Sequence, residues 1–190
     1  MYPAEVVERI RNEVSLSAIE GLVTYLGGVR EGRKAVILVS EGYSNYLPPQ
    51  LRDPVADLPG IGNPNRTAAG FGDGSNAEDR ARFFQNIDIQ TRLREVFSAA
   101  NRSNTAIYAL DPRGLAPFEF DINERVGTQT DSRMLQMTQD TLRVLAEETE
   151  GRAIVNRNDL DTGLRQIVRD SSAYYLLGYN STEAPADGKF

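Results

Sequence analysis

Cysteine, histidine and tryptophan are all missing from this chain of 190 residues. Without cysteine it has no disulfide framework, thiolate zinc site, iron–sulfur cluster or cysteine nucleophile. Without histidine it lacks the Ser-His-Asp triad, the usual imidazole general base and most catalytic zinc sites. These absences exclude a large part of enzyme chemistry.

Basic clusters and long apolar runs are missing as well. The net charge is −6, from 27 acidic and 21 basic residues that are spread along the chain, so we expect no nucleic-acid partner. No run approaches the roughly 20 apolar residues of a membrane span, so we expect no membrane insertion by this chain. The N-terminal segment has no basic start followed by an apolar stretch, so it is not a typical signal peptide.

Helical and strand patterns alternate along the chain. Apolar residues recur at every third or fourth position in four segments, which predicts helices over residues 6–29, 79–102, 133–150 and 159–168. Short apolar runs predict strands over residues 34–41, 105–111, 152–156 and 173–180. This order predicts an α/β fold with a mostly parallel sheet, although the last strand could be antiparallel and start another sheet.

The first predicted strand has five central apolar positions that do not alternate with polar ones. That pattern is typical of a strand buried on both faces, so we expect helices on both sides of it. Only three or four strands are predicted, where a sheet usually has about 5–6. We therefore expect a sheet that is incomplete at the N-terminus, with residues 181–190 as a linker or the start of a following strand.

Two connections are far longer than the roughly 2–6 residues usual between a strand and a helix. Residues 43–78 form a 36-residue insertion with five prolines and five glycines, and residues 112–132 form a second one of 21 residues. Both follow the carboxyl ends of strands, the edge at which open α/β sheets bind ligands. We expect a binding role for them, with surface decoration as the alternative.

Polar side chains follow three of the predicted strands. Glu41, Asp111 and Asn156 would meet at one edge if these strands are neighbours, which makes Glu41 and Asp111 candidate ligands for Mg²⁺. Capping of the following helix or loop is the alternative. The candidate ligand-binding residues are Asn156 and, in the first insertion, Tyr43, Ser44 and Tyr46, with loop anchoring as the alternative for the two tyrosines.

Four segments together resemble a known family: RKAVILVSEGYS, NTAIYALDPRGL, the run over residues 145–180, and PADGKF. They are similar to the bacterial vWA-related family of the von Willebrand factor type A fold, over residues 1–180 and to the second half of that domain. The resemblance implies a three-layer, doubly wound, Rossmann-like α/β domain with a metal-ion-dependent adhesion site at the carboxyl edge of its sheet. It also implies a binding module that is periplasmic or secreted.

The metal site of that family begins with an Asp-x-Ser-x-Ser motif on the first strand, and this chain starts after the corresponding strand. Glu41, in Ser-Glu-Gly, stands where the family has an aspartate. We therefore expect an incomplete site here, with Mg²⁺ bound only in the complete domain.

The function expected from these features is non-catalytic: a protein-interaction or adhesion module whose partner binds at the carboxyl edge. One alternative is a Mg²⁺-dependent phosphotransfer or hydrolytic enzyme that uses Glu41 and Asp111. Another is a purely structural segment of a larger assembly.

Overall fold

The computed structural model describes residues 4–29, 32–48, 51, 76–124 and 126–172. Its elements follow the order α1 (Ala4–Val29), β1 (Lys34–Val39), α3 (Asn76–Arg102), β2 (Thr105–Leu110), the 3-10 helix η1 (Ile122–Glu124), α4 (Thr128–Glu147), β3 (Ala153–Ile154) and α5 (Leu160–Ser172). The four predicted helices and the first three predicted strands are confirmed. The predicted strand over residues 173–180 and the tail over residues 181–190 lie outside the described residues.

The three described strands form one parallel sheet in the order β1-β2-β3. β1 pairs with β2 along its whole length, from Lys34 opposite Thr105 to Val39 opposite Leu110. β3 is short and pairs with the end of β2, where Ala109 lies opposite Ala153. The predicted α/β class with a parallel sheet is therefore confirmed.

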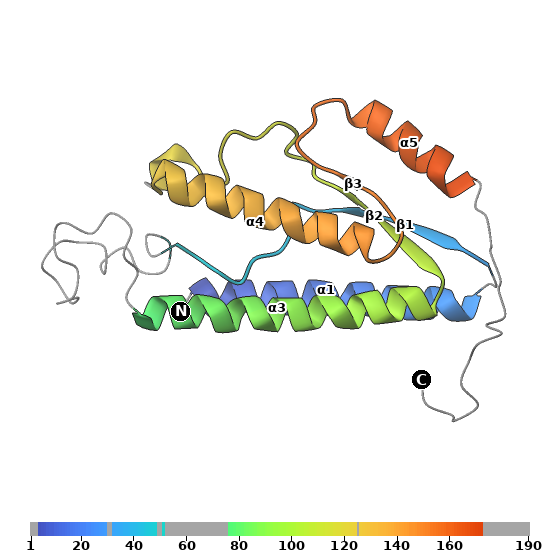
Figure 1. Ribbon diagram of the computed structural model, residues 1–190, viewed down its shortest axis with the longest axis horizontal. Helices are drawn as coiled ribbons and strands as arrows, with labels where there is room; N and C mark the ends of the chain where they lie inside the picture. The colour runs from blue at the N-terminus through green and yellow to red at the C-terminus, as the bar shows by residue number, and fades with distance from the viewer. Residues whose placement is uncertain (1–3, 30–31, 49–50, 52–75, 125, 173–190) are drawn as a thin grey trace, which may run out of the picture.

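Helices cover both faces of the central strand β2 (Figure 1). On one face Ile107 packs into a core shared with α1, α3 and α4. On the other face Tyr108 packs with Ile167 of α5. Because successive residues of a strand point to opposite faces, one fully buried strand serves both cores.

The expectation that the first strand is buried on both faces is wrong. Val36 and Leu38 of β1 are half-buried on the face shared with α1 and α3, whereas Ala35, Ile37 and Val39 are exposed on the other face. β1 lies at the edge of the described sheet, and α5 packs over β2 and β3 instead. The unbroken apolar run is typical of a strand that is buried on both faces. Here one face of β1 is exposed, because β1 lies at the edge of the described sheet and α5 does not reach it.

The long helix α1 also differs from a simple amphipathic helix. Its inward face carries Leu16, Ile19 and Val23, which are buried against α3 and the sheet. Most of the apolar residues that produced the helical pattern lie on the outer side and are exposed: Val7, Ile10, Val14, Leu22, Tyr25 and Val29. None of the described helices is both long and apolar enough to cross a membrane.

Candidate functional site

The ends of the three strands meet at one edge of the sheet, as the sequence predicts. The Ser40 N–H donates to the Leu110 carbonyl at 3.0 Å, and the Asp111 N–H donates to the Ile154 carbonyl at 2.9 Å. Asp111 is buried at the end of the central strand, whereas Glu41 and Asn156 are exposed beside it. The three predicted polar residues therefore follow adjacent strands, but only Asp111 lies in the interior.

Both carboxylate oxygens of Asp111 are bound by Arg113. The Arg113 Nε donates to Oδ1 at 2.9 Å and its Nη2 donates to Oδ2 at 2.9 Å. The Arg113 backbone N–H also donates to Oδ1, at 3.0 Å. This bidentate geometry is the strong form of an arginine–carboxylate pair.

The same guanidinium joins the two loops that follow β1 and β2. Its Nη2 donates to the Glu41 carbonyl at 2.7 Å, and its Nη1 forms an ion pair with Glu119. The Thr138 hydroxyl of α4 donates to Glu119 at 3.2 Å. We call this set the Arg113 cluster: the Glu41 carbonyl with the side chains of Asp111, Arg113, Glu119 and Thr138.

Burial and pairing have opposite effects on the pKa values in the Arg113 cluster. Burial raises the pKa of Glu119, and the charge of Arg113 only partly offsets that rise. Burial lowers the pKa of Arg113, but the hydrogen bonds to Asp111 and the charge of Glu119 outweigh it, so the pKa of Arg113 is raised. Arg113 therefore remains a cation.

Glu41 and Asp111 are the two candidate magnesium ligands at this edge. Among the described residues, no three acidic side chains are placed to hold one metal ion. Arg113 already binds both oxygens of Asp111, whose side chain is fully buried, so a cation would compete with the guanidinium for them. Magnesium binding by Glu41 and Asp111 stays a prediction.

The start of the first insertion is anchored in the protein interior. Tyr43, Asn45 and Tyr46 are buried. The Asn12 amide of α1 donates to the Ser44 carbonyl at 2.9 Å and to the Asn45 side-chain oxygen at 3.0 Å. The Tyr43 N–H donates to the Thr141 hydroxyl of α4 at 2.9 Å. The loop is thus tied to helices on both sides, while residues 52–75 of the insertion lie outside the described residues.

The second insertion is held by one buried carboxylate. Asp131, in the first turn of α4, accepts hydrogen bonds from the backbone N–H groups of Glu119 (3.0 Å) and Phe120 (2.8 Å). These bonds fix the loop that presents Glu119 to Arg113. The described part of this insertion therefore has a defined conformation.

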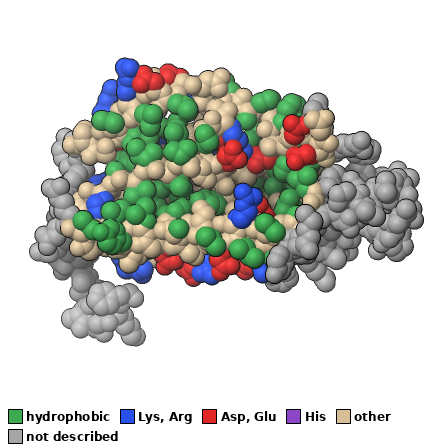
Figure 2. Space-filling model, turned by 180° about the vertical axis from the view of Figure 1, so that it is seen from behind, with side chains coloured by type: hydrophobic (Ala, Val, Ile, Leu, Met, Phe, Trp, Pro, Cys, Tyr) green, Lys and Arg blue, Asp and Glu red, His purple; other side chains and the backbone are tan. Residues whose placement is uncertain are grey.

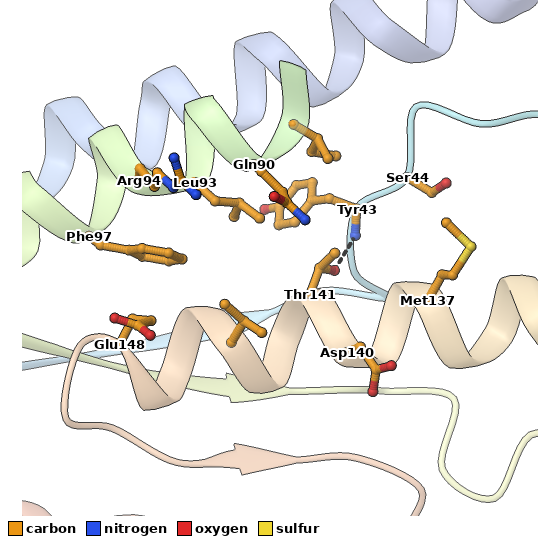
Figure 3. Close-up of a pocket in the computed structure, with 12 residues that line it drawn as sticks. Tyr43, Ser44, Gln90, Leu93, Arg94, Phe97, Met137, Asp140, Thr141 and Glu148 are labelled. Atoms are coloured by element: carbon orange, nitrogen blue, oxygen red, sulfur yellow. Dashed lines mark hydrogen bonds between the residues drawn. The ribbon is translucent and has the colours of Figure 1, made fainter. Parts of the chain in front are cut away.

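A groove of about 470 Å³ runs between α3 and α4 (Figure 3). Tyr43 and Ser44 line one end, beside Met137. Leu93, Phe97 and Val144 supply apolar walls, and the charged side chains along it are Arg94, Asp140 and Glu148. Of the four predicted ligand-binding residues, Tyr43 and Ser44 line this groove, whereas Tyr46 and Asn156 do not.

Three residues that organise the site were not recognised in the sequence: Asn12, Arg113 and Asp131. The spacing of Asp111 and Arg113, two residues apart after a strand, was the available signal for the ion pair. No local motif marks Asn12 or Asp131, because each binds the backbone of a loop at least 11 residues away in the sequence.

No protein family, curated protein or solved structure matches this chain. The relation to the vWA-related family therefore stays a resemblance.

Proposed function

We propose that this chain is a non-catalytic binding module that recognises a segment of a protein partner in the groove between α3 and α4, starting at the carboxyl edge of the sheet. The resemblance to the vWA-related family supports a doubly wound, Rossmann-like domain and an extracytoplasmic location. The proposal itself depends on the residues that form the edge.

The observation that carries the proposal is the pairing of both oxygens of the buried Asp111 carboxylate with Arg113. Its two oxygens are bound by Arg113, which is also held by Glu119 and the Glu41 carbonyl. A general base or metal ligand needs an oxygen that the substrate or cation can reach. The Asp111 side chain is fully buried and paired, which disfavours the alternative of a Mg²⁺-dependent enzyme that uses Glu41 and Asp111. The cluster instead fixes two loops and α4, which is what a preorganised binding surface requires.

The chemistry of the groove indicates the kind of ligand. Leu93 and Phe97 of α3 line it (Figure 3), and so does Val144 of α4. Arg94 lies on one side, and Asp140 and Glu148 lie on the other. Two helices with apolar walls and charged rims of opposite sign suit an amphipathic peptide segment, whose apolar side chains would enter between them.

The test compares two aspartate substitutions at equally exposed side chains. Val144 lines the groove and Ile87 of α3 does not, and each is 43% exposed. The wild-type chain is immobilised, and proteins from a native cell envelope are captured and identified. The captured partner is then titrated against the wild type, Val144→Asp and Ile87→Asp.

A charge in the groove removes an apolar contact and adds a desolvation penalty, so we expect Val144→Asp to raise Kd at least about tenfold. Ile87→Asp should leave Kd within about twofold, which also controls for the added charge. Equal binding by both variants would contradict the groove as the binding site. Folding of each variant is checked by its thermal melt.

A further inference from the structure

The solvent side of α1 is apolar along nearly the whole helix. Four large side chains lie on it, and they are between 42% and 70% exposed: Val7, Ile10, Val14 and Tyr25. The remaining positions hold small, exposed residues: Ser17, Ala18, Gly21 and Gly28. We call these residues together the outer face of α1, and Figure 2 views the molecule from this side. A helix face in contact with water normally carries charged residues, so this face is suited to contact with another protein surface.

The contacts of α1 show that this face is turned away from the described core. Leu16, Ile19 and Val23 are buried in the core. At about 100° per residue, the mean direction of these three side chains is opposite to that of the outer face. Glu13 points to one side of the helix, where it forms an ion pair with Arg92 of α3 at 2.6 Å. The outer face itself carries no charge.

The outer face is complementary to itself when two copies of α1 pack antiparallel. A two-fold axis between Ser17 and Ala18 brings residues at equal distances from it opposite one another, and it exchanges the positions of the outer face among themselves. The resulting pairs, from the axis outwards, are Ser17–Ala18, Val14–Gly21, Ile10–Tyr25 and Val7–Gly28. A Cβ placed on Gly21 or Gly28 would meet no atom within 4 Å. A valine of one copy can therefore occupy the open space beside each glycine of the other.

The size of this surface suits a weak dimer. The large side chains of the outer face, with Leu22 and Val29 at its margin, are each about half exposed. At on the order of 200 Å² for a large side chain, they expose on the order of 600 Å² of apolar surface per chain. Two copies would then bury about 1,200 Å², which is the low end for a specific protein–protein interface.

We propose that α1 is the interface of a symmetric homodimer, in which the outer faces of two copies pack antiparallel about an axis between Ser17 and Ala18. The residues that line the groove between α3 and α4 do not belong to α1. The dimer would therefore present two grooves, and a partner with two binding segments would be bound more tightly than by one chain.

The first test compares the same substitution at two equally exposed valines. Val14 of the outer face is 63% exposed, and Val168 of α5 is 64% exposed. Analytical ultracentrifugation over a series of protein concentrations measures the Kd of the dimer for the wild type, Val14→Asp and Val168→Asp. We expect a Kd in the micromolar range for the wild type.

Val14→Asp buries one unpaired charge per copy in the interface, so we expect it to raise this Kd at least about tenfold. Val168→Asp adds the same charge outside the interface and should leave Kd within about twofold. Thermal melts check the folding of each variant. If Val14→Asp does not fold, Tyr25→Asp takes its place.

The second test addresses the antiparallel register, and the absence of native cysteine makes disulfide trapping specific. The two copies of Ala18 lie next to the axis, where their Cα atoms would be within the roughly 4.4–6.8 Å that a disulfide spans. The two copies of Val7 would lie about 30 Å apart, at a rise of 1.5 Å per residue. We expect Ala18→Cys to form a disulfide-linked dimer at least about tenfold faster than Val7→Cys does.

Three results would overturn the proposal. A wild-type chain that stays monomeric at a protein concentration of about 1 mM would show that the outer face does not bind a second copy. Equal Kd values for Val14→Asp and Val168→Asp would show that copies associate through another surface. Equal rates of disulfide formation for Ala18→Cys and Val7→Cys would contradict the antiparallel pairing about this axis.

Discussion

Arg113 lies between two carboxylates that have little contact with solvent, and its positive charge is the counter-ion of both. The side chain of Asp111 is fully buried and that of Glu119 is 14% exposed. Removing one partner of such a group leaves charge in a poorly solvated place, which costs more than the net value of the pair. Removing any one of the three charged side chains of the Arg113 cluster should therefore destabilise the fold.

The substitution Arg113→Met keeps most of the side-chain volume and removes the charge. We expect it to lower the free energy of unfolding by about 3–5 kcal/mol, because Asp111 and Glu119 lose their counter-ion. Urea denaturation measures the change. The exposed pair of Arg165 and Asp161 provides the control, since Arg165→Met should cost no more than about 0.5 kcal/mol. A loss below about 1 kcal/mol for Arg113→Met would contradict this account of the cluster.

Glu119 should make the free energy of unfolding decrease as the pH rises. Burial raises its pKa in the folded state, so the folded protein holds this proton more tightly than the unfolded chain does. The contribution of Glu119 is therefore most favourable below the ordinary glutamate pKa of about 4.3, and it is lost as the pH rises through the raised value. Relative to Glu119→Gln, the wild type should lose stability with rising pH in this window. Urea denaturation from pH 4 to 7 tests it, and a difference between the two proteins that does not change with pH would refute it.

The loop after β1 is shaped by close approach to α4. Gly42 has a φ of 97°, and a Cβ placed on it would lie 2.1 Å from the Thr138 carbonyl oxygen. Both the left-handed backbone and the contact require glycine. This approach also brings Tyr43 to Thr141, so the wall of the groove depends on it.

Gly42→Ala should therefore destabilise the fold by at least about 2 kcal/mol, since the strained backbone alone costs about 1–3 kcal/mol. Gly21→Ala is the matched control, because a Cβ there meets no atom within 4 Å and the residue lies inside α1. A helix-interior glycine replaced by alanine is expected to add about 0.5–1 kcal/mol of stability. Thermal and urea unfolding of both variants measure the two effects, and similar values would contradict the proposed packing of the loop.

Local periodicity in the sequence was enough to predict the helices and the parallel strands, because it reflects the repeat of each element. It could not predict burial. Ile37 and Val39 are as apolar as buried strand residues, but no described helix covers their face. The meeting of Glu41, Asp111 and Asn156 at one edge could be predicted, because parallel strands end at the same edge of a sheet. The pairing of Asp111 with Arg113 could not be predicted, because it depends on the conformation of the loop after β2.

At the scale of the whole molecule, two surfaces have different characters. The groove between α3 and α4 is apolar with charged rims, whereas the outer side of α1 carries the exposed side chains of Val14, Leu22 and Tyr25. Figure 2, seen from the side of α1, shows hydrophobic side chains gathered in a broad band. Exposed apolar surfaces of this extent are usually covered in the functional state. We assign the groove to a protein partner.

Magnesium should add little to the stability of this chain. If Kd is 1 mM or above, 1 mM MgCl₂ stabilises the fold by at most about RT ln 2, roughly 0.4 kcal/mol. For a domain of this size that corresponds to a shift in Tm of about 1–2 °C. Thermal melts in MgCl₂ and in EDTA, for the wild type and Glu41→Ala, test this value. A shift above about 5 °C that disappears in Glu41→Ala would show a metal site that the Arg113 cluster does not allow.

The most direct test of the central claim is the Kd of the captured partner, measured by calorimetry in 1 mM MgCl₂ and again in EDTA. Because Arg113 binds both oxygens of Asp111 at the carboxyl edge, we predict Kd values within about twofold of each other, and a rise of at least about tenfold for Val144→Asp in both buffers. Loss of binding in EDTA, together with unchanged binding by Val144→Asp, would contradict the account.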